Sequence, residues 1–260
     1  MNKQDDTLLY NRILELANRA YKNNIYSFTD FLGLSQQDVF YKVIKDAKFP
    51  PIHYELFGGS SNCERQVVRF GSEEDLGYAV DFPIVCIKIE SLYKNATLYS
   101  HRDYLGSLMG LGIERKKFGD IIVDQKDAYV FCLDTTGDYV LENLSSVGHN
   151  SVKCSLSKLP DSYAQEALTR IIIQCASPRI DAIISKVYNL SRKDAIPLFT
   201  EKRVYVNGRI VENKKLHLCI SALKKAKDDK KEKPKATVKL EWIFGKIAML
   251  IQVMTELFFM

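Results

Sequence analysis

Closely spaced cysteines are absent from this sequence. Its six cysteines are scattered and include no Cys-x-x-Cys pair. This spacing argues against a zinc site and against a secreted disulfide scaffold. The cysteines at 86 and 132 stand within the apolar runs 84–87 and 130–133. We therefore expect buried thiols, in a protein of the reducing cytoplasm that needs no metal and no cofactor.

Long apolar runs are also missing. The chain opens with MNKQDD and continues into an amphipathic segment, so we expect no signal peptide. Residues 240–260 are apolar, but Lys246 and Glu256 interrupt them, and a spanning helix needs about 20 apolar residues. We expect no membrane span and an amphipathic packing segment at 240–260, with association to a membrane surface as the alternative.

Negative charge is scarce in the C-terminal part. Residues 179–235 hold 16 Lys and Arg against 7 Asp and Glu, a net charge of +9. The whole chain carries +5, so the remainder carries −4. This asymmetry favours a polyanionic partner, either nucleic acid or an anionic membrane. A solvated basic surface is the plainer alternative, and the local footprint favours nucleic acid.

The context of a kinase is lacking around its one kinase-like triplet. Residues 101–103 read His-Arg-Asp, the start of a kinase catalytic loop. The asparagine expected five residues after the aspartate is Leu108, and neither Asp-Phe-Gly nor a Gly-rich phosphate loop is present. The triplet therefore does not predict a kinase, since such a motif needs its structural context.

Apolar periodicity predicts a small α+β domain at residues 1–78. Helical spacing predicts helices at 7–23, 27–32 and 35–47, the last with Ser35 as its N-cap and with two prolines after its end. A Gly-Gly turn at 58–59 then precedes a strand at 64–70.

A second pattern begins near residue 79. Strands are predicted at 82–89, 119–123, 128–133 and 151–154, with helices at 101–111 and 135–145. The order βαββαβ is that of ferredoxin-like domains and RNA-recognition motifs, and we assign it to residues 79–156. The apolar residues expected to pack helix 101–111 on the sheet are Leu105, Leu108, Met109 and Leu111.

Basic and small residues flank this helix. Arg102 stands at its start, and Arg115, Lys116 and Lys117 follow its end. These four are candidate phosphate contacts, with solvated loops as the alternative. Gly106 and Gly110 lie four apart and allow a neighbouring backbone to approach closely.

Two aromatic residues share one face of strand 128–133. Tyr129 and Phe131 are two residues apart. RNA-recognition motifs stack bases on aromatics of this strand, but the basic-Gly-aromatic-Gly signature before them is absent here. We therefore expect core or interdomain packing for this pair.

The C-terminal stretch 179–211 carries the strongest signal. It predicts a helix from Arg179, a second helix N-capped by Ser191 with Asp194 completing the cap, and a hairpin turning at Asn207-Gly208. Arg192 and Lys193 place two cations in the first turn of the second helix, against the helix dipole. That local cost makes sense if they face an anionic ligand.

This stretch resembles the RNA-binding domain of the fourth small-subunit ribosomal protein, here called the S-four-type module. The residues that carry the resemblance are Arg179, Asp181, Ser191, Arg192, Ala195, Val204, Val206, Asn207, Gly208 and Val211. The resemblance implies an RNA-gripping surface. Its contacts would be Arg179, Ser191, Arg192, Lys193, Lys202, Arg203 and Arg209, with Asn207 and Gly208 fixing the turn. Lys202 departs from the pattern, which usually has glycine there.

The whole order resembles the YlmH family of bacterial RNA-binding proteins. The resemblance rests on GGSSNCER at 58–65, HRDYLGSLMGLGIERKKFGDIIV at 101–123 and the S-four-type module. We expect three domains (1–78, 79–156 and 157–213) and a monomeric, cytoplasmic protein. The resemblance implies that the protein has no catalytic activity. It also implies that this protein binds ribosomal RNA and transfer RNA on the large ribosomal subunit during quality control. Family members are sometimes labelled cell-division proteins.

After residue 213 the chain departs from that pattern. A Lys-rich low-complexity run at 214–239 and an apolar end at 240–260 replace the family's last strand. We hypothesise a frameshift or a lineage-specific replacement, which resequencing the gene would test.

Two rival functions stay open. S-four-type modules also accompany pseudouridine synthases, which need a catalytic aspartate. Asp103 and Asp120 are candidates only through nearby basic residues, and they are more simply a helix-start acid and a turn residue ahead of a strand. The other rival is a cell-division scaffold, which would leave the cations at 192 and 193 unexplained.

Overall fold

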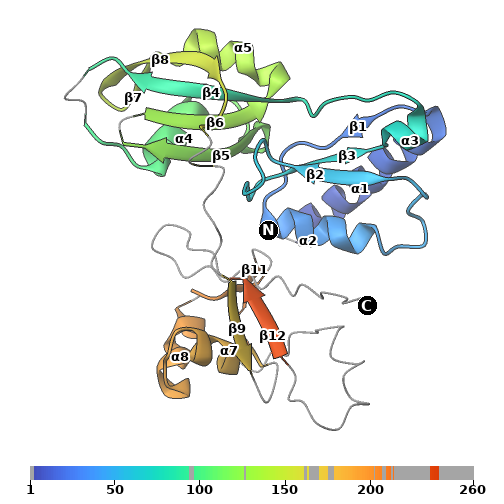
Figure 1. Ribbon diagram of the computed structural model, residues 1–260, viewed down its shortest axis with the longest axis vertical. Coiled ribbons are helices and arrows are strands. Elements are labelled where there is room, and N and C mark those ends of the chain that lie inside the picture. Colours follow the sequence, from blue (N-terminus) through green and yellow to red (C-terminus); the bar gives the residue numbers. More distant parts are fainter. Residues whose placement is uncertain are drawn as a thin grey trace. The chain divides into compact units, whose positions relative to one another are not determined.

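The computed structural model describes residues 3–93, 97–125, 127–160, 163, 170–174, 179–201, 203–206, 209–211, 213 and 235–239. The chain forms two compact units, residues 1–166 and 167–260, which are described separately (Figure 1).

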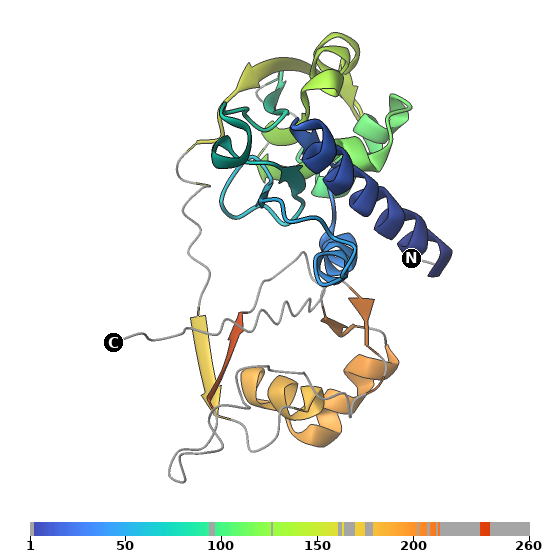
Figure 2. The ribbon, with the colours of Figure 1, turned by 90° about the vertical axis from the view of Figure 1, so that its right-hand side faces the viewer.

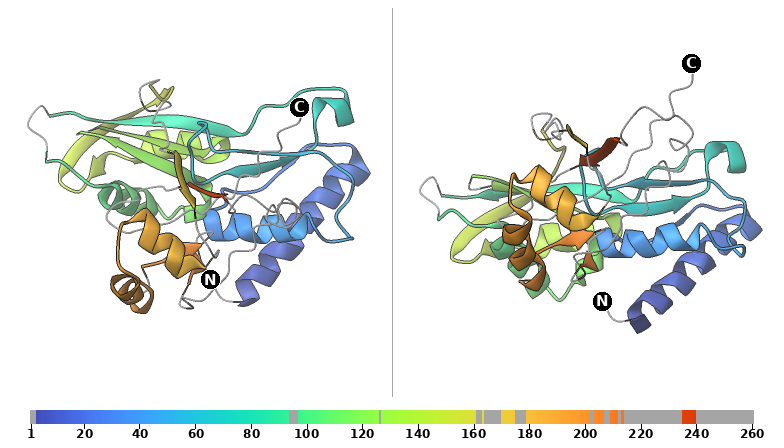
Figure 3. Two further views of the ribbon diagram at one scale, coloured as in Figure 1. Left: turned by 60° about the horizontal axis from the view of Figure 1, so that its bottom comes forward. Right: turned by 90° about the horizontal axis from the view of Figure 1, so that it is seen from below.

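The first unit begins with an α+β part. Two helices, α1 (Lys3–Asn23) and α2 (Leu34–Val43), lie on the same side of a three-stranded antiparallel sheet (Figure 3). The sheet has the order β1 (Ser27–Phe28), β3 (Val67–Phe70), β2 (Tyr54–Phe57), and the short helix α3 (Glu73–Leu76) follows β3. The apolar faces of the two helices meet alternate residues of β3 in a buried core that includes Ile13, Ala17, Phe40, Val68 and Phe70.

Two expectations for this part are wrong. Residues 27–32 form no helix: β1 pairs with β3, and the Thr29 hydroxyl accepts a hydrogen bond from the Val68 N–H (2.9 Å). The helix predicted at 35–47 starts earlier, with Gly33 as its N-cap, and ends at Val43. The Gln36 side chain accepts the Gly33 N–H (2.9 Å), so Ser35 is not the cap.

The rest of the first unit is a ferredoxin-like domain, as predicted. Its elements are β4 (Ile84–Ser91), α4 (His101–Gly110), β5 (Phe118–Asp124), β6 (Asp127–Leu133), α5 (Asp134–Asn143), β7 (Ser146–Val147) and β8 (Asn150–Ser157). The antiparallel sheet has the order β5-β6-β4-β8-β7. The additional strand β7 forms a hairpin with β8, which the sequence pattern did not predict.

The five-stranded sheet is packed on both faces. Tyr104 and Leu108 of α4 and Val140 of α5 contact one face through Ile87, Ile89 and Val130. The opposite face carries Cys86, Tyr129 and Phe131, and these pack against Phe31, Cys63 and Val67 of the N-terminal part. Met109 was expected in the core but is 38% exposed.

The second unit contains the predicted helix pair and hairpin. Its elements are β9 (Arg170–Gln174), α7 (Ile180–Val187), α8 (Arg192–Thr200), β10 (Tyr205–Val206), β11 (Arg209–Ile210) and β12 (Lys235–Lys239). Figure 2 shows β9 and β12 as an antiparallel pair. The two helices close over Ile180, Ile183, Ile184, Ala195 and Phe199.

The segment that departs from the family pattern thus contributes one strand, β12. Residues 240–260 lie outside the described residues. Among the residues that are described, no helix is both long and apolar enough to cross a bilayer.

Candidate nucleic-acid interface

Arg179 and Asp181 form a paired charge at the start of α7. The guanidinium donates to both carboxylate oxygens, from Nε to Oδ1 (3.0 Å) and from Nη2 to Oδ2 (2.6 Å). The hydrogen bond from Arg179 lowers the pKa of the Asp181 carboxyl, which is buried. Arg179, a predicted RNA contact, therefore already has an anionic partner within the protein, and Asp181 is the buried residue that orients it.

The first turn of α8 presents the predicted cations. Ser191 is the N-cap, as expected: its hydroxyl accepts the Asp194 N–H (3.1 Å) and donates to the Asp194 carboxylate (2.6 Å). Arg192 and Lys193 are exposed. Among the described residues neither is joined to a partner by a hydrogen bond or a short ion pair, although the charge of Arg192 helps to lower the pKa of the Asp181 carboxyl. Two free cations beside the N-terminal N–H groups of a helix form a surface suited to phosphate.

The hairpin carries less information. Arg203 pairs with Glu201 (3.2 Å), and both side chains are exposed. Arg209 pairs with Val206 across β10 and β11, but its side chain lies outside the described residues. Lys202, Asn207 and Gly208 also lie outside them, so their predicted contacts remain predictions.

The cations after α4 face the protein. The Arg115 guanidinium donates to the carbonyl oxygens of Phe118 (2.6 Å) and Gly119 (3.1 Å). Lys117 pairs with Asp30 (2.7 Å), and Lys116 pairs with Glu114 (3.0 Å) and Asp30 (3.8 Å). The two lysines join the N-terminal part to the ferredoxin-like domain through Asp30, whereas Arg115 binds carbonyl oxygens within the ferredoxin-like domain. All three cations therefore have partners within the first unit.

Arg65 also joins the N-terminal part to the ferredoxin-like domain, and the sequence analysis did not predict this role. It donates to the carbonyl oxygens of Phe118 (Nε, 2.9 Å) and Phe31 (Nη2, 3.0 Å). Burial lowers its pKa to about 10, so it stays charged at neutral pH. The sequence offers one signal for Arg65, because it ends the motif GGSSNCER at 58–65. The motif does not indicate which residues the Arg65 side chain contacts.

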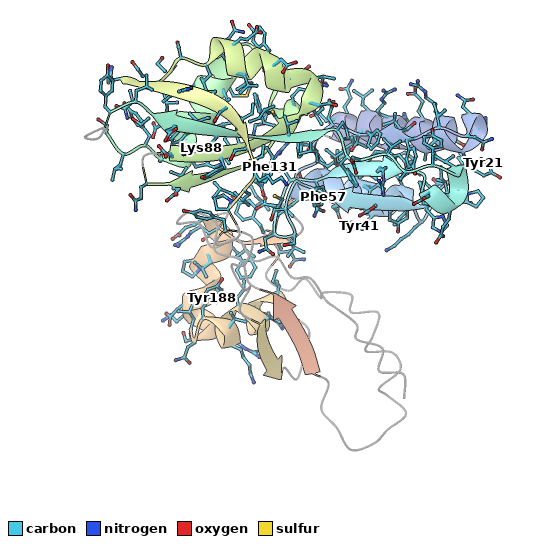
Figure 4. The ribbon with its side chains drawn as sticks, turned by 45° about the horizontal axis from the view of Figure 1, so that its top comes forward. Tyr21, Tyr41, Phe57, Lys88, Phe131 and Tyr188 are labelled. Atoms are coloured by element: carbon cyan, nitrogen blue, oxygen red, sulfur yellow. The ribbon has the colours of Figure 1, made fainter. Side chains whose placement is uncertain are left out.

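Tyr129 and Phe131 are buried, as expected, and do not offer a stacking platform. Phe131 lies at the junction of the two sheets (Figure 4). Gly59 sits against it at a φ of +101°, and a Cβ at that position would overlap the ring. Tyr129 contacts the Tyr163 ring, with centroids 6.3 Å apart. The sheet face used for bases in RNA-recognition motifs is therefore covered at this strand.

The two aspartates considered for catalysis have structural partners. Asp103 accepts the Ser100 N–H (2.8 Å) and hydroxyl (2.7 Å), which makes it the helix-start acid that was expected. Asp120 lies within β5 rather than in a turn. Its carboxylate accepts the N–H groups of Glu64 (2.5 Å) and Arg65 (3.1 Å).

The four thiols in the described part of the chain have raised pKa values. Burial raises the pKa of Cys63 and Cys132 to about 12, and that of Cys86 and Cys154 to about 11. Such thiols are protonated at neutral pH and are poor nucleophiles or metal ligands. Within the described residues, no group of three or more His, Cys, Asp and Glu is placed to hold a metal ion.

Three comparisons with known proteins agree on one family. Residues 78–161 match the family model described as the putative RNA-binding domain in YlmH. The chain is 26% identical over 214 residues to the ribosome-associated protein quality control protein P2 of Bacillus subtilis, covering 81% of both chains. The chain is thus similar to YlmH proteins, over residues 78–161 in the family model and over 81% of its length in the Bacillus subtilis relative.

A solved YlmH structure has the same fold. The cell division protein YlmH from Streptococcus pneumoniae aligns with a TM-score of 0.50 at 20% identity, over 63% of this chain and 96% of that one. The YlmH family model places the putative RNA-binding domain on the ferredoxin-like part. These findings support an RNA-binding role.

Proposed function

We propose that this protein is a non-enzymatic, cytoplasmic RNA-binding protein that binds ribosomal RNA and transfer RNA on the large ribosomal subunit. Its role would be in the quality control of stalled ribosomes, as the name of the Bacillus subtilis relative suggests. It would act as a monomer.

The observation that carries the proposal is the free charge at the start of α8. Arg192 and Lys193 are exposed, whereas Arg179 and Arg203 are paired with carboxylates. Phosphate contacts by such cations supply most of the affinity of RNA-binding proteins, through release of counterions. The proposal therefore requires binding that weakens steeply as salt rises.

Sedimentation with purified ribosomal subunits across a salt series tests it. We expect the full-length protein to co-migrate with the large subunit at low salt and to dissociate as salt rises. The Arg192→Glu/Lys193→Glu variant should stay at the top of the gradient. Lys45→Glu/Lys48→Glu makes the same charge change at two exposed lysines beside α2 and should still co-migrate. Failure of the wild-type protein to co-migrate at low salt would contradict the proposal.

A scaffold in cell division is the second candidate, because the aligned Streptococcus pneumoniae structure is of a cell division protein. Nuclease treatment of complexes purified with the protein separates the two functions: RNA-dependent partners should be lost, and a scaffold's partners kept.

An RNA-modifying enzyme is less well supported, since Asp103 and Asp120 are engaged in hydrogen bonds. An assay for pseudouridine in RNA incubated with the protein tests that reading.

A further inference from the structure

The ferredoxin-like domain needs an RNA surface other than its sheet at β6. Phe131 is covered by the N-terminal part, and Tyr129 is 7% exposed. Bases therefore cannot stack on these rings, which is the usual mode of binding by an RNA-recognition motif. If the proposed function holds, on which this inference rests, RNA must reach the domain elsewhere.

The unpaired cations of this domain indicate which of its surfaces could contact RNA. Lys88 pairs with Glu90 and Asp127, and the cations at 115–117 are engaged as described above. In the described part of residues 78–161, three cations make no hydrogen bond or ion pair: Arg102, Lys153 and Lys158. All three are exposed. Of these, Arg102 lines a groove.

The groove runs along the face of α4 that carries Arg102, Gly106 and Gly110. It has a volume of about 570 Å³, and its second wall is the segment 143–148 that joins α5 to β8. Arg102, Gly106 and Gly110 are spaced four apart and so share one face of the helix. A Cβ at either glycine would meet nothing within 4 Å. The two glycines thus face open space, and no neighbouring backbone of the described chain fills it.

Polar groups line both walls. Ser107 comes from α4, and Asn143, Ser145 and Ser146 come from the facing segment. Hydroxyl and amide groups of this kind bind phosphate and sugar oxygens without reading sequence. Asp103 also lines the groove. Its Oδ2 atom is held by Ser100 at the helix N-terminus, where the helix dipole compensates a negative charge.

We propose that this groove binds a single segment of RNA sugar–phosphate backbone. The Arg102 guanidinium pairs with one phosphate, and the hydroxyls of the two walls bind neighbouring phosphate or ribose oxygens. The glycines let the backbone lie against α4, in the space that a side chain would occupy. With one free cation and one nearby carboxylate, the groove adds to the binding by α8 and does not replace it.

The test uses the full-length protein with purified large ribosomal subunits, and with the ribosomal RNA extracted from them. Arg102→Ala should weaken binding to both probes about five- to tenfold, and lower the slope of log K against log salt by about one. Lys153→Ala removes the same charge outside the groove and should change binding less than about twofold.

The glycines provide a size series. Gly106→Ala should leave binding near the wild-type value, and Gly106→Leu should weaken it at least about tenfold, because the longer side chain fills the groove. Both variants should be at least as stable as the wild type, since helical glycine is unfavourable. Thermal unfolding separates a filled groove from a damaged fold.

The outcomes distinguish this inference from the proposed function. If the wild type binds and Arg192→Glu/Lys193→Glu does not, while Arg102→Ala and Gly106→Leu bind like the wild type, the groove is not an RNA site and the proposed function stands. If the wild type binds neither probe, both proposals fail. If the variants lose the subunit but keep the extracted RNA, the groove docks a ribosomal protein instead, and the inference is overturned.

Discussion

Asp120 holds the backbone of Arg65, and Arg65 in turn holds the strand of Asp120. The carboxylate accepts the Arg65 N–H (3.1 Å), and the Arg65 guanidinium donates to the carbonyl of Phe118 (2.9 Å), two residues before Asp120. Through this reciprocal contact the N-terminal part and the ferredoxin-like domain form a single unit.

Replacing Asp120 by asparagine should destabilise the first unit. The amide has one acceptor oxygen for the two N–H groups of Glu64 and Arg65, and its NH₂ group would face donors. Leaving a buried polar group unpaired costs about 1–3 kcal/mol. Urea denaturation followed by circular dichroism measures the loss. Asp138→Asn changes an exposed carboxylate on α5 and should leave the urea midpoint unchanged. Equal midpoints for the two variants would show that the Asp120 contacts do not stabilise the first unit.

Two glycines should respond to alanine in opposite directions. Gly59 has a φ of +101° and abuts the Phe131 ring, so Gly59→Ala should lose at least about 2 kcal/mol from backbone strain and overpacking. Gly106 lies in a helix facing open space, so Gly106→Ala should gain about 0.5–1 kcal/mol. Thermal unfolding of both variants is sufficient, and a destabilised Gly106→Ala would contradict the open groove.

The periodic parts of the fold were predictable from sequence because local pattern and tertiary burial agree there. The helix at 101–110 and the strands around 119–133 have one apolar face each, and each found a sheet or helix to bury it. The segment at 27–32 was misassigned, because its Ser, Thr and Asp residues imitate a helix cap. Its strand pairing depends on β3, some forty residues away.

The predicted roles of the charged and capping residues also depended on whether their partners are near in sequence. Sequence shows that Arg115, Lys116 and Lys117 are cations, but not that Asp30 and the carbonyls of Phe118 and Gly119 neutralise or bind them. Ser191 could be predicted as a cap because its partner Asp194 is only three residues away. Partners distant in sequence decide which cations stay free, and no local pattern reports them.

Phe131 should matter for stability and not for RNA binding. Phe131→Leu removes a buried ring from the core shared by the two sheets, which should cost about 1–3 kcal/mol. The affinity of the folded protein for large-subunit RNA, measured well below the melting temperature, should equal that of the wild type. A variant that folds but binds weakly would show that the sheet face contacts RNA after all.

The stability of the C-terminal module should fall in acid through Asp181. The hydrogen bond from Arg179 lowers the folded-state pKa of this carboxyl below its unfolded value of about 3.9. Its contribution is therefore present above pH 4 and is lost as pH falls through the depressed folded value. The free energy of unfolding of the wild type should exceed that of Asp181→Asn at pH 7. The difference between the two should shrink toward about pH 2–3. Urea titrations that follow the methyl signals of Ile183 and Ile184 would measure it; a constant difference across that range would contradict the linkage.

Two arginines of the C-terminal module should differ in their salt signature. Arg192 is free, so its contact with phosphate releases a counterion, and Arg192→Ala should lower the slope of log K against log salt by about 0.7–0.9. Arg203 is paired with Glu201 at 3.2 Å, so the pair carries little net charge to the RNA, and Arg203→Ala should lower the slope by less. Binding of large-subunit RNA between 50 and 300 mM salt (about the range in which such contacts are resolved) measures both. Equal slopes for the two variants would mean that Arg203 leaves Glu201 for phosphate on binding, and Glu201→Gln would then leave the slope unchanged.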